Sequence, residues 1–231
     1  MTLPQEGPVP VARPVQKNVK PDNAAPPAEE LRKEELQPPP PPLMEERATV
    51  VDACIAELRS AGAVVKVTER IDPKNGCGIA RPVTVSRLTP DIEIVPEATL
   101  RCETALQLQR WTREAIVPAT KAAMPDKRLV GLDQASAYVC RNRNGAPNGK
   151  ISEHAFGNAI DIAAFAFSDG SQLAIAPREE DASTEGALQR AAVATACLYF
   201  TTVLDPGSDA AHETHLHLDV KKRANGYRYC W

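Results

Sequence analysis

The four histidines of the chain fall in two short segments that could together hold a metal ion. His154 lies in the segment SEHAFGNAID, and the other three lie in HETHLH, which begins at His212. The first segment also carries Asp161. Imidazole nitrogens and carboxylate oxygens are zinc ligands, and a catalytic zinc takes three protein ligands and keeps a fourth position open. The two segments therefore predict a zinc-dependent hydrolase.

The second segment is predicted to run into a strand over residues 215–220 with one polar face. Side chains alternate between the two faces of a strand. His215, His217 and Asp219 should therefore face one way, while the leucines and the valine between and after them face the core. This strand would present nitrogen ligands on a single surface.

The first segment has small residues where a metal site needs room. Gly157 allows the chain to turn sharply, and Ala159 leaves space beside Asp161. His154 in a loop and Asp161 on a strand can then reach one point. We expect the metal to be held by these two residues and His217, with the fourth position open to water.

The elements that position these segments are indicated by apolar spacing. Helices are predicted over residues 46–61, 98–124 and 183–200, with Pro118 bending or breaking the second and Ser183 or Thr184 capping the third. Strands are predicted over residues 63–67, 83–85, 129–132, 135–141, 159–167, 173–176 and 215–220. We expect an α+β fold, in which helices pack on a small, mainly antiparallel sheet that carries the zinc site.

The N-terminal region differs in composition from the rest of the chain. Its first 42 residues hold 12 of the 21 prolines and neither a cysteine nor an aromatic residue. Such a segment cannot bury a core, so we expect residues 1–44 to be a disordered, extended proline-rich linker. An unstructured tail is favoured over an SH3-type ligand. Residues 45–231 should form one domain of ordinary size.

Charge and hydropathy exclude two classes of partner. The net charge is −3 with basic and acidic residues interspersed, which argues against nucleic-acid binding. No run approaches the roughly 18 apolar residues of a transmembrane helix.

The start, MTLPQEGPVP, lacks the basic and apolar regions of a signal peptide. Either a leader lies upstream or export is not encoded in this chain.

The six cysteines favour three disulfides. They form no CxxC pair, and none lies in the histidine segments, so a cysteine-ligated zinc is poorly supported. Disulfides indicate an oxidising compartment; the alternative is six reduced thiols in the cytosol. Six cysteines allow about 15 pairings, among which the sequence does not choose. Our working pairing is Cys54–Cys77, Cys102–Cys140 and Cys197–Cys230.

The two histidine segments resemble the motifs of a metallopeptidase superfamily that includes lysostaphin, D-Ala-D-Ala metallopeptidases and sonic hedgehog. Its SxHxxGxAxD motif is matched by Ser152, His154, Gly157, Ala159 and Asp161, and its HxH motif by His215 and His217. The spacing of the last three histidines is similar to the penicillin-insensitive murein endopeptidase branch. Across nearly all of the folded part, including the six cysteines and the ending YRYCW, the chain resembles the bacterial extensin-like C-terminal domain family.

The resemblance implies a role for each histidine. Zinc would be bound by His154, Asp161 and His217, and His215 would be the catalytic histidine that accepts and returns a proton. His212 would stabilise the developing oxyanion or help to hold His215. Several relatives carry a glutamate base three residues before the second histidine ligand, and this chain has a threonine there.

Further residues are expected around the ligands. The segment Ser136–Tyr138 followed by Arg141 resembles the superfamily's SGYR strand, whose arginine meets substrate oxygens. A guanidinium near zinc would bind a carboxylate or an oxyanion. We choose Arg141 over Arg143, which we interpret as a solvated loop charge. We expect Ser152, Glu213 and Asp219 to fix the imidazole tautomers through hydrogen bonds to the ring nitrogens that do not bind the metal.

Together these features predict a zinc metallopeptidase of the endopeptidase or D,D-carboxypeptidase type, with one zinc per chain. Its substrates would be peptide bonds in peptidoglycan stem peptides or cross-links, and it would lie in the periplasm or elsewhere in the cell envelope. One alternative is a catalytically inactive, zinc-containing module that binds the cell wall. Another is a structural wall protein in which the proline-rich arm dominates. The bond cleaved and the oligomeric state stay open.

Overall fold

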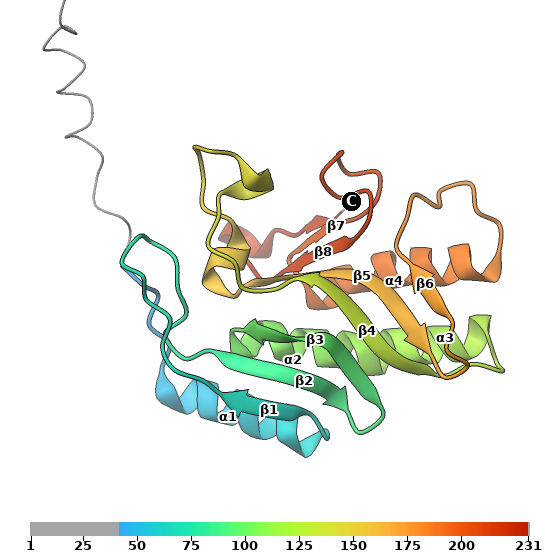
Figure 1. The fold of residues 1–231 in the computed structure, drawn as a ribbon, viewed down its shortest axis with the longest axis horizontal. Coiled ribbons are helices and arrows are strands. Elements are labelled where there is room, and N and C mark those ends of the chain that lie inside the picture. The colour runs from blue at the N-terminus through green and yellow to red at the C-terminus, as the bar shows by residue number, and fades with distance from the viewer. Residues whose placement is uncertain (1–41, 231) are drawn as a thin grey trace, which may run out of the picture. The chain divides into compact units, whose positions relative to one another are not determined.

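A computed structural model describes residues 42–230, which fold around one sheet (Figure 1). The α-helices are α1 (Ala48–Ser60), α2 (Cys102–Trp111), α3 (Val117–Ala123) and α4 (Thr184–Tyr199). The strands are β1 (Val64–Val67), β2 (Val83–Thr89), β3 (Ile92–Leu100), β4 (Leu129–Ser136), β5 (Ala159–Phe167), β6 (Gln172–Ala174), β7 (Thr202–Leu204), β8 (Leu216–Asp219) and β9 (Tyr229–Cys230). Short 3-10 helices span Arg143–Gly145, Glu153–Phe156 and Ala224–Gly226.

The sheet is larger and more mixed than expected. Its nine strands run in the order β1-β2-β3-β4-β5-β8-β7-β9, with β6 also paired to β5. The β3–β4 and β7–β9 pairs are parallel and the others antiparallel. The α+β class is confirmed. The expectation of a small sheet is wrong, and the sheet is mixed, although six of its eight strand pairs are antiparallel. The helical segment between β3 and β4 is long enough to carry the chain back to the other end of the sheet. Parallel neighbours need such a crossover, so these two strands can run parallel.

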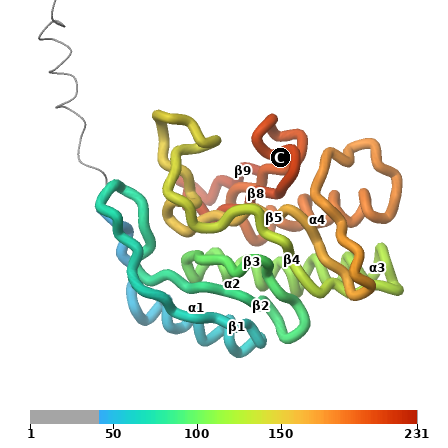
Figure 2. The backbone as a smooth tube through the Cα atoms, in the orientation of Figure 1, coloured from blue at the N-terminus to red at the C-terminus, as the bar shows by residue number. Residues whose placement is uncertain are grey.

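The helices gather on one side of the sheet and enclose the core (Figures 1 and 2). Trp111 of α2 lies at its centre, with its ring centroid 6.2 Å from those of both Phe165 and Phe200. On β5, Ile160 and Ile162 are fully buried and belong to this core. Because side chains alternate along a strand, the residue between these two isoleucines faces the other side of the sheet.

Three local predictions are corrected by the structure. Residues 98–100 belong to β3, so the second helical region begins only at Cys102. The predicted break at Pro118 is absent, since the helical backbone continues into α3. A π-helical turn at Thr112–Ile116 precedes the proline. Pro118 lies near the start of α3, where a residue needs no hydrogen-bonded N–H. In place of the two strands predicted over 129–132 and 135–141 there is one strand, β4, which ends at Ser136, and residues 137–141 are not part of a strand. The cap that Ser183 forms on α4, through the N–H of Gly186, is confirmed.

Three disulfides are present, as expected, but only one pair was predicted correctly. Cys197–Cys230 is confirmed. The other pairs are Cys54–Cys102 and Cys77–Cys140. The first joins α1 to the start of α2, which packs beside it, and the second joins two loops separated by 63 positions in sequence. Pairing neighbours along the chain failed because the packing of the elements decides which cysteines meet.

The described residues include no helix with both the length and the apolar character needed to cross a bilayer. The predicted linker, residues 1–44, lies outside the described residues except for its last three positions. Its predicted disorder therefore stays a prediction.

Candidate metal centre

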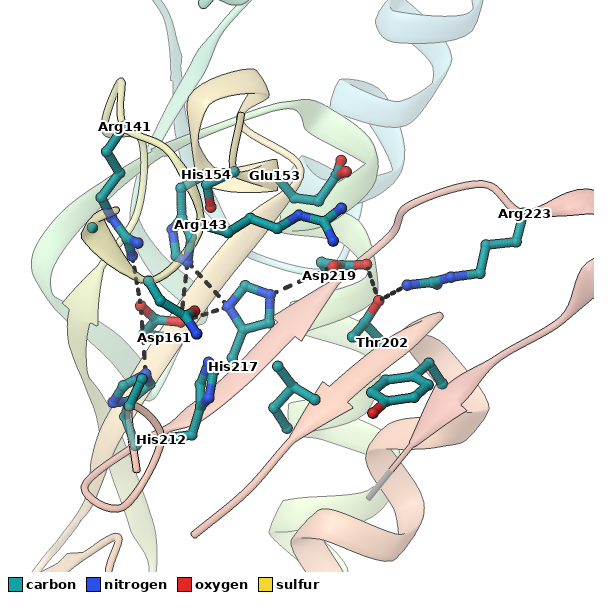
Figure 3. A pocket seen from close by; sticks show the side chains of 17 residues that line it. Arg141, Arg143, Glu153, His154, Asp161, Thr202, His212, His217, Asp219 and Arg223 are labelled. Carbon is teal, nitrogen blue, oxygen red and sulfur yellow. Dashed lines mark hydrogen bonds and ion pairs between the residues drawn. The ribbon is translucent and has the colours of Figure 1, made fainter. Parts of the chain in front are cut away.

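Two histidines and one aspartate converge on the sheet face opposite the helices (Figure 3). His154 Nε2 lies 3.1 Å from Asp161 Oδ1 and 3.1 Å from His217 Nδ1. His217 Nδ1 lies 2.9 Å from the same Asp161 oxygen. The convergence predicted from the sequence is confirmed. These three residues form a group that could hold a metal ion.

The register of two strands brings two of the ligands together. In the antiparallel pair β5–β8, Asp161 lies directly opposite His217. Side chains opposite each other in such a pair have Cβ atoms about 4.5–5.5 Å apart, so both could reach the same metal ion. The neighbouring Leu216 and Leu218 are fully buried on the other face, as the predicted alternation requires.

The third ligand, His154, comes from the 3-10 helix Glu153–Phe156, which ends at Gly157. This glycine has a left-handed φ of +66°, and a Cβ there would lie 2.9 Å from the backbone nitrogen of Arg101. Only glycine fits this turn without displacement of the backbone. The turn is held by hydrogen bonds from Gly78 N–H to Ala155 O (2.8 Å) and from Arg101 N–H to Gly157 O (2.9 Å).

Hydrogen bonds to the outer ring nitrogens favour the tautomers that a metal needs. His154 Nδ1–H donates to Ala137 O at 2.7 Å, and His217 Nε2–H points to Asp219 Oδ2 at 3.4 Å. With a metal bound, the inner nitrogens would carry no proton and could bind the ion beside the Asp161 carboxylate. Tetrahedral zinc bonds of about 2.0–2.1 Å would separate such ligand atoms by about 3.3 Å. The donor set and its spacing therefore fit zinc.

The charges of the cluster are strongly coupled. Burial alone would raise the pKa of Asp161, but hydrogen bonds from His154 and His217 hold it well below its usual range. Burial alone would lower the pKa of His217, but its contacts with Asp161 and Asp219 raise it to about 9. In the metal-free protein a proton on His217 therefore balances the buried carboxylate, and a metal cation would take its place.

A chain of hydrogen-bonded side chains extends from the Nε2 side of the His217 ring. Asp219 Oδ1 accepts hydrogen bonds from Thr202 Oγ1 (2.6 Å) and from the N–H of Lys221 (2.9 Å). Thr202 Oγ1 in turn accepts one from Arg223 Nη2 at 2.6 Å. Sequence analysis missed Thr202 and Arg223. Thr202 reaches the site through the β7–β8 register, where it lies opposite Asp219, and no motif in the sequence indicates this.

The cluster opens into a cavity of about 450 Å³ that also contains Arg141, His212 and His215. Two of these approach Asp161 Oδ2, His215 through Nε2 at 3.8 Å and Arg141 through Nη2 at 3.9 Å. Burial is the main cause that lowers the pKa of His215. His212 Nδ1–H donates to Asp209 Oδ1 at 2.7 Å, which fixes the orientation of its ring.

The remaining predicted residues divide into those inside and those outside this cavity. Ser152 is buried and lines it, and so does Asp219. Arg143 lines it as well, from the short 3-10 helix Arg143–Gly145, and is exposed. Glu213 is exposed and does not line the cavity, so it is not brought to the ligands.

The fold and the cluster together define a disulfide-linked α+β domain with a two-histidine, one-aspartate group on its sheet. Residues 52–231 match the family model described as the extensin-like protein C-terminus, and the chain belongs to this family. The resemblance noted in the sequence is confirmed at this level. No curated protein matches the chain.

Proposed function

We propose that the protein is a zinc-dependent peptidase that cleaves peptide bonds in peptidoglycan stem peptides or cross-links. The observation that carries the proposal is the convergence of His154 Nε2, Asp161 Oδ1 and His217 Nδ1 within 3.1 Å of one another, beside an open cavity. Three protein ligands and an accessible fourth side are typical of catalytic rather than structural zinc.

The residues around the ligands support a hydrolytic role. When bound, zinc would polarise the peptide carbonyl and make the attacking water more acidic. His215 would accept a proton from this water at Nε2 and return it to the leaving amine. Burial lowers the pKa of His215, which favours the neutral ring that a base requires. Its exposed fraction of 17% leaves the ring accessible from the cavity.

Two further side chains would act on the substrate. Arg141, at 3.9 Å from Asp161 Oδ2, would donate to the carbonyl oxygen as negative charge develops, or to a substrate carboxylate. His212, oriented by Asp209, would stabilise the same oxygen or hold His215. With Arg143 and Arg223 also lining the cavity, the site suits peptides that carry free carboxylates, as wall stem peptides do.

The substrate class and the location also rest on resemblance. The SxHxxGxAxD and HxH motifs are similar to those of a superfamily that includes lysostaphin and D-Ala-D-Ala metallopeptidases, and these two kinds of member act on cell-wall peptides. The three disulfides are consistent with a protein outside the reducing cytosol. We therefore place the proposed activity in the periplasm or elsewhere in the cell envelope.

The test combines metal analysis with a wall digest. The purified chain should carry one zinc, and it should release new amino groups from purified muropeptides in a chelator-sensitive manner. His215→Ala should keep zinc but lose turnover by about 10²–10⁴-fold. A variant that keeps full turnover would refute the assignment of the base. Wild-type protein that binds no zinc would refute the metal centre itself.

A second function is favoured by one observation. Within the described part of the chain the His215 ring makes no hydrogen bond that would fix its tautomer, and Thr214 stands where several relatives carry a glutamate base. A catalytically inactive zinc module that binds wall peptides would need no base. Wild-type protein that carries zinc and binds muropeptides, yet releases no amino group from any of them, would favour this module.

A further inference from the structure

A row of polar side chains leads from the start of the described chain to the metal centre. Its members lie in four separate parts of the sequence, and none was singled out by sequence analysis as part of a network. We call it the Glu46 network, and it comprises Glu46, Arg101, Asn158, Glu153 and Lys221.

The links at the near end are direct hydrogen bonds. Arg101 Nη2 donates to Glu46 Oε1 at 2.8 Å, and Arg101 Nη1 donates to Asn158 Oδ1 at 2.7 Å. Asn158 Nδ2 donates to Glu153 Oε2 at 2.9 Å. Each member is thus fixed by the next, from the segment before α1 to the 3-10 helix that carries His154.

The far end of the network reaches the second histidine ligand. Glu153 is the neighbour of His154 in the chain, and its other oxygen accepts from Lys221 Nζ. The backbone N–H of Lys221 donates to Asp219 Oδ1 at 2.9 Å, and Asp219 Oδ2 faces His217 Nε2. One connected set of contacts therefore runs from Glu46 to Asp219 beside His217, and it passes through Glu153, the chain neighbour of His154. Figure 3 shows Glu153, His154, His217 and Asp219 around the cavity.

Asn158 is the central member. It lies between two ligands in sequence, four residues after His154 and three before Asp161. Its backbone N–H donates to Glu153 O at 3.0 Å, and its carbonyl accepts from Val220 N–H at 3.1 Å. Both the side chain and the backbone of Asn158 are hydrogen-bonded, and only 4% of its surface is exposed. Asn158 therefore fixes the position of the loop between His154 and Asp161 relative to β5 and the end of β8.

Leu43 and Met44, in the segment before α1, line one pocket together with residues of the segment 153–158. A Cβ built at Gly78 would lie 3.1 Å from Leu43 Cδ1, and the N–H of Gly78 donates to Ala155 O in the His154 helix. Met44 Sδ accepts a hydrogen bond from Arg101 Nη1 at 3.4 Å. In Figure 2 the start of the described chain, in blue, lies at the end of the sheet that bears the yellow loop before His154.

The ion pair that begins the network is largely buried. The side chains of Arg101 and Glu46 are 11% and 12% exposed, and Arg101 Nε and Glu46 Oε2 are buried without hydrogen-bond partners. A buried ion pair gains little net stability over apolar packing because desolvation offsets the attraction. The strict geometry it imposes is a better reason for its presence than stability.

We propose that residues 43–47 are a positioning element for the metal centre, in which Glu46 acts through Arg101 and Asn158 to hold the loop between His154 and Asp161. Glu46 touches neither metal nor substrate, so it is a positioning residue. The inference rests on the proposed zinc site for its function, but the mechanical link can be tested without metal.

The first test measures zinc affinity in the full chain by competition with a chromophoric chelator. Glu46→Ala should weaken zinc binding by about three- to tenfold, somewhat less than the effect usual for residues that contact a ligand directly. The matched control is Asp52→Ala, which removes an exposed carboxylate on α1 that pairs with Arg81 at 2.7 Å. This control should bind zinc as wild type does. Equal affinities in the two variants would overturn the proposal.

The second test asks whether Glu46 acts through Asn158. Asn158→Ala should weaken zinc binding by about 10- to 100-fold. Adding Glu46→Ala to that variant should cause little further loss, because residues in one network give non-additive effects. Fully additive losses would show that Glu46 acts independently of Asn158 and would contradict the proposed route.

The third test follows hydrogen exchange in metal-free protein. The amides of Gly157 and Asn158 should exchange faster in Glu46→Ala than in Asp52→Ala. Glu46→Gln, which keeps an oxygen for Arg101, should give a smaller effect and serves if the alanine variant does not fold. Unchanged exchange would overturn the inference. If wild type binds no zinc but exchange still responds, the positioning role stands and the zinc proposal fails.

Discussion

The two faces of the β5–β8 pair are built from residues that alternate along the same two strands, yet the two faces differ in role. On one face, Ile160 lies opposite Leu218 and both are fully buried against the helices. On the other face, Asp161 lies opposite His217, and both belong to the group that could hold a metal ion. Packing on the first face fixes the register, and this register sets the distance between ligands on the second. The comparison predicts that stability and metal affinity can be perturbed separately.

Loss of a ligand should have the largest effect. Asp161→Ala removes the carboxylate shared by both imidazoles, and zinc affinity should fall by more than about a hundredfold, with loss of peptidase activity. Metal content after dialysis, together with chelator competition, measures this. Asp126→Ala, at an exposed carboxylate in the loop before β4, is the control. Retention of zinc by Asp161→Ala would disprove the ligand assignment.

A change on the apolar face should act on stability instead. Leu218→Ala empties space in a closed core and should lower the free energy of unfolding by about 2–5 kcal/mol. Urea unfolding of metal-free protein measures this loss. The folded variant should still bind one zinc with affinity close to that of wild type. A loss of affinity as large as that of Asp161→Ala would show that the two faces are not separable.

The contact behind His217 should have an intermediate effect on the metal face. Asp219→Asn keeps the shape of the side chain but replaces a charged acceptor with a neutral one, so zinc affinity should fall by about 10- to 100-fold. Thr202→Val removes only the hydroxyl that donates to Asp219 and should change affinity less. Chelator titration of both variants gives the ranking, and the reverse order would refute the chain of contacts.

Proton release on zinc binding should be the smallest of these effects, but it reports directly on the charge of the His217 ring. The raised pKa of His217, about 9, means that metal-free protein holds this proton at pH 7.5 and must lose it to bind zinc. Calorimetry in buffers of different ionisation enthalpy should find about one proton released per zinc. Affinity should rise with pH up to about 9. Without metal, the stability from protonated His217 is present below pH 6.5 and is lost as pH rises through about 9.

The ligand cluster could be predicted because its information is local. Histidines two residues apart at the start of a strand are expected on one face, and the small residues Gly157 and Ala159 leave room beside Asp161. The outer partners could not be predicted in the same way. Thr202 meets Asp219 only through strand register, and Arg101 meets Glu46 across 55 positions of sequence. No local pattern indicates such contacts.

In the fold, too, elements with a strong local pattern could be predicted, and features that depend on distant parts of the chain could not. The helix at residues 183–200 and the strand β5 were predicted closely, since each carries a full apolar pattern. The strands β7 and β9 were missed because three and two residues are too few to show a period. The disulfide partners of Cys54 and Cys77 depend on how elements pack, so chain proximity misassigned them.

The chain's last strand has a practical consequence for handling the protein. Tyr229 of β9 lines the metal cavity, and the Cys197–Cys230 bridge anchors that strand to α4. A polyhistidine tag fused behind Trp231 would begin three residues after Tyr229 and would bring further imidazoles close to the same site. Affinity handles are better attached at the proline-rich end, so that measured zinc content reflects the native ligands.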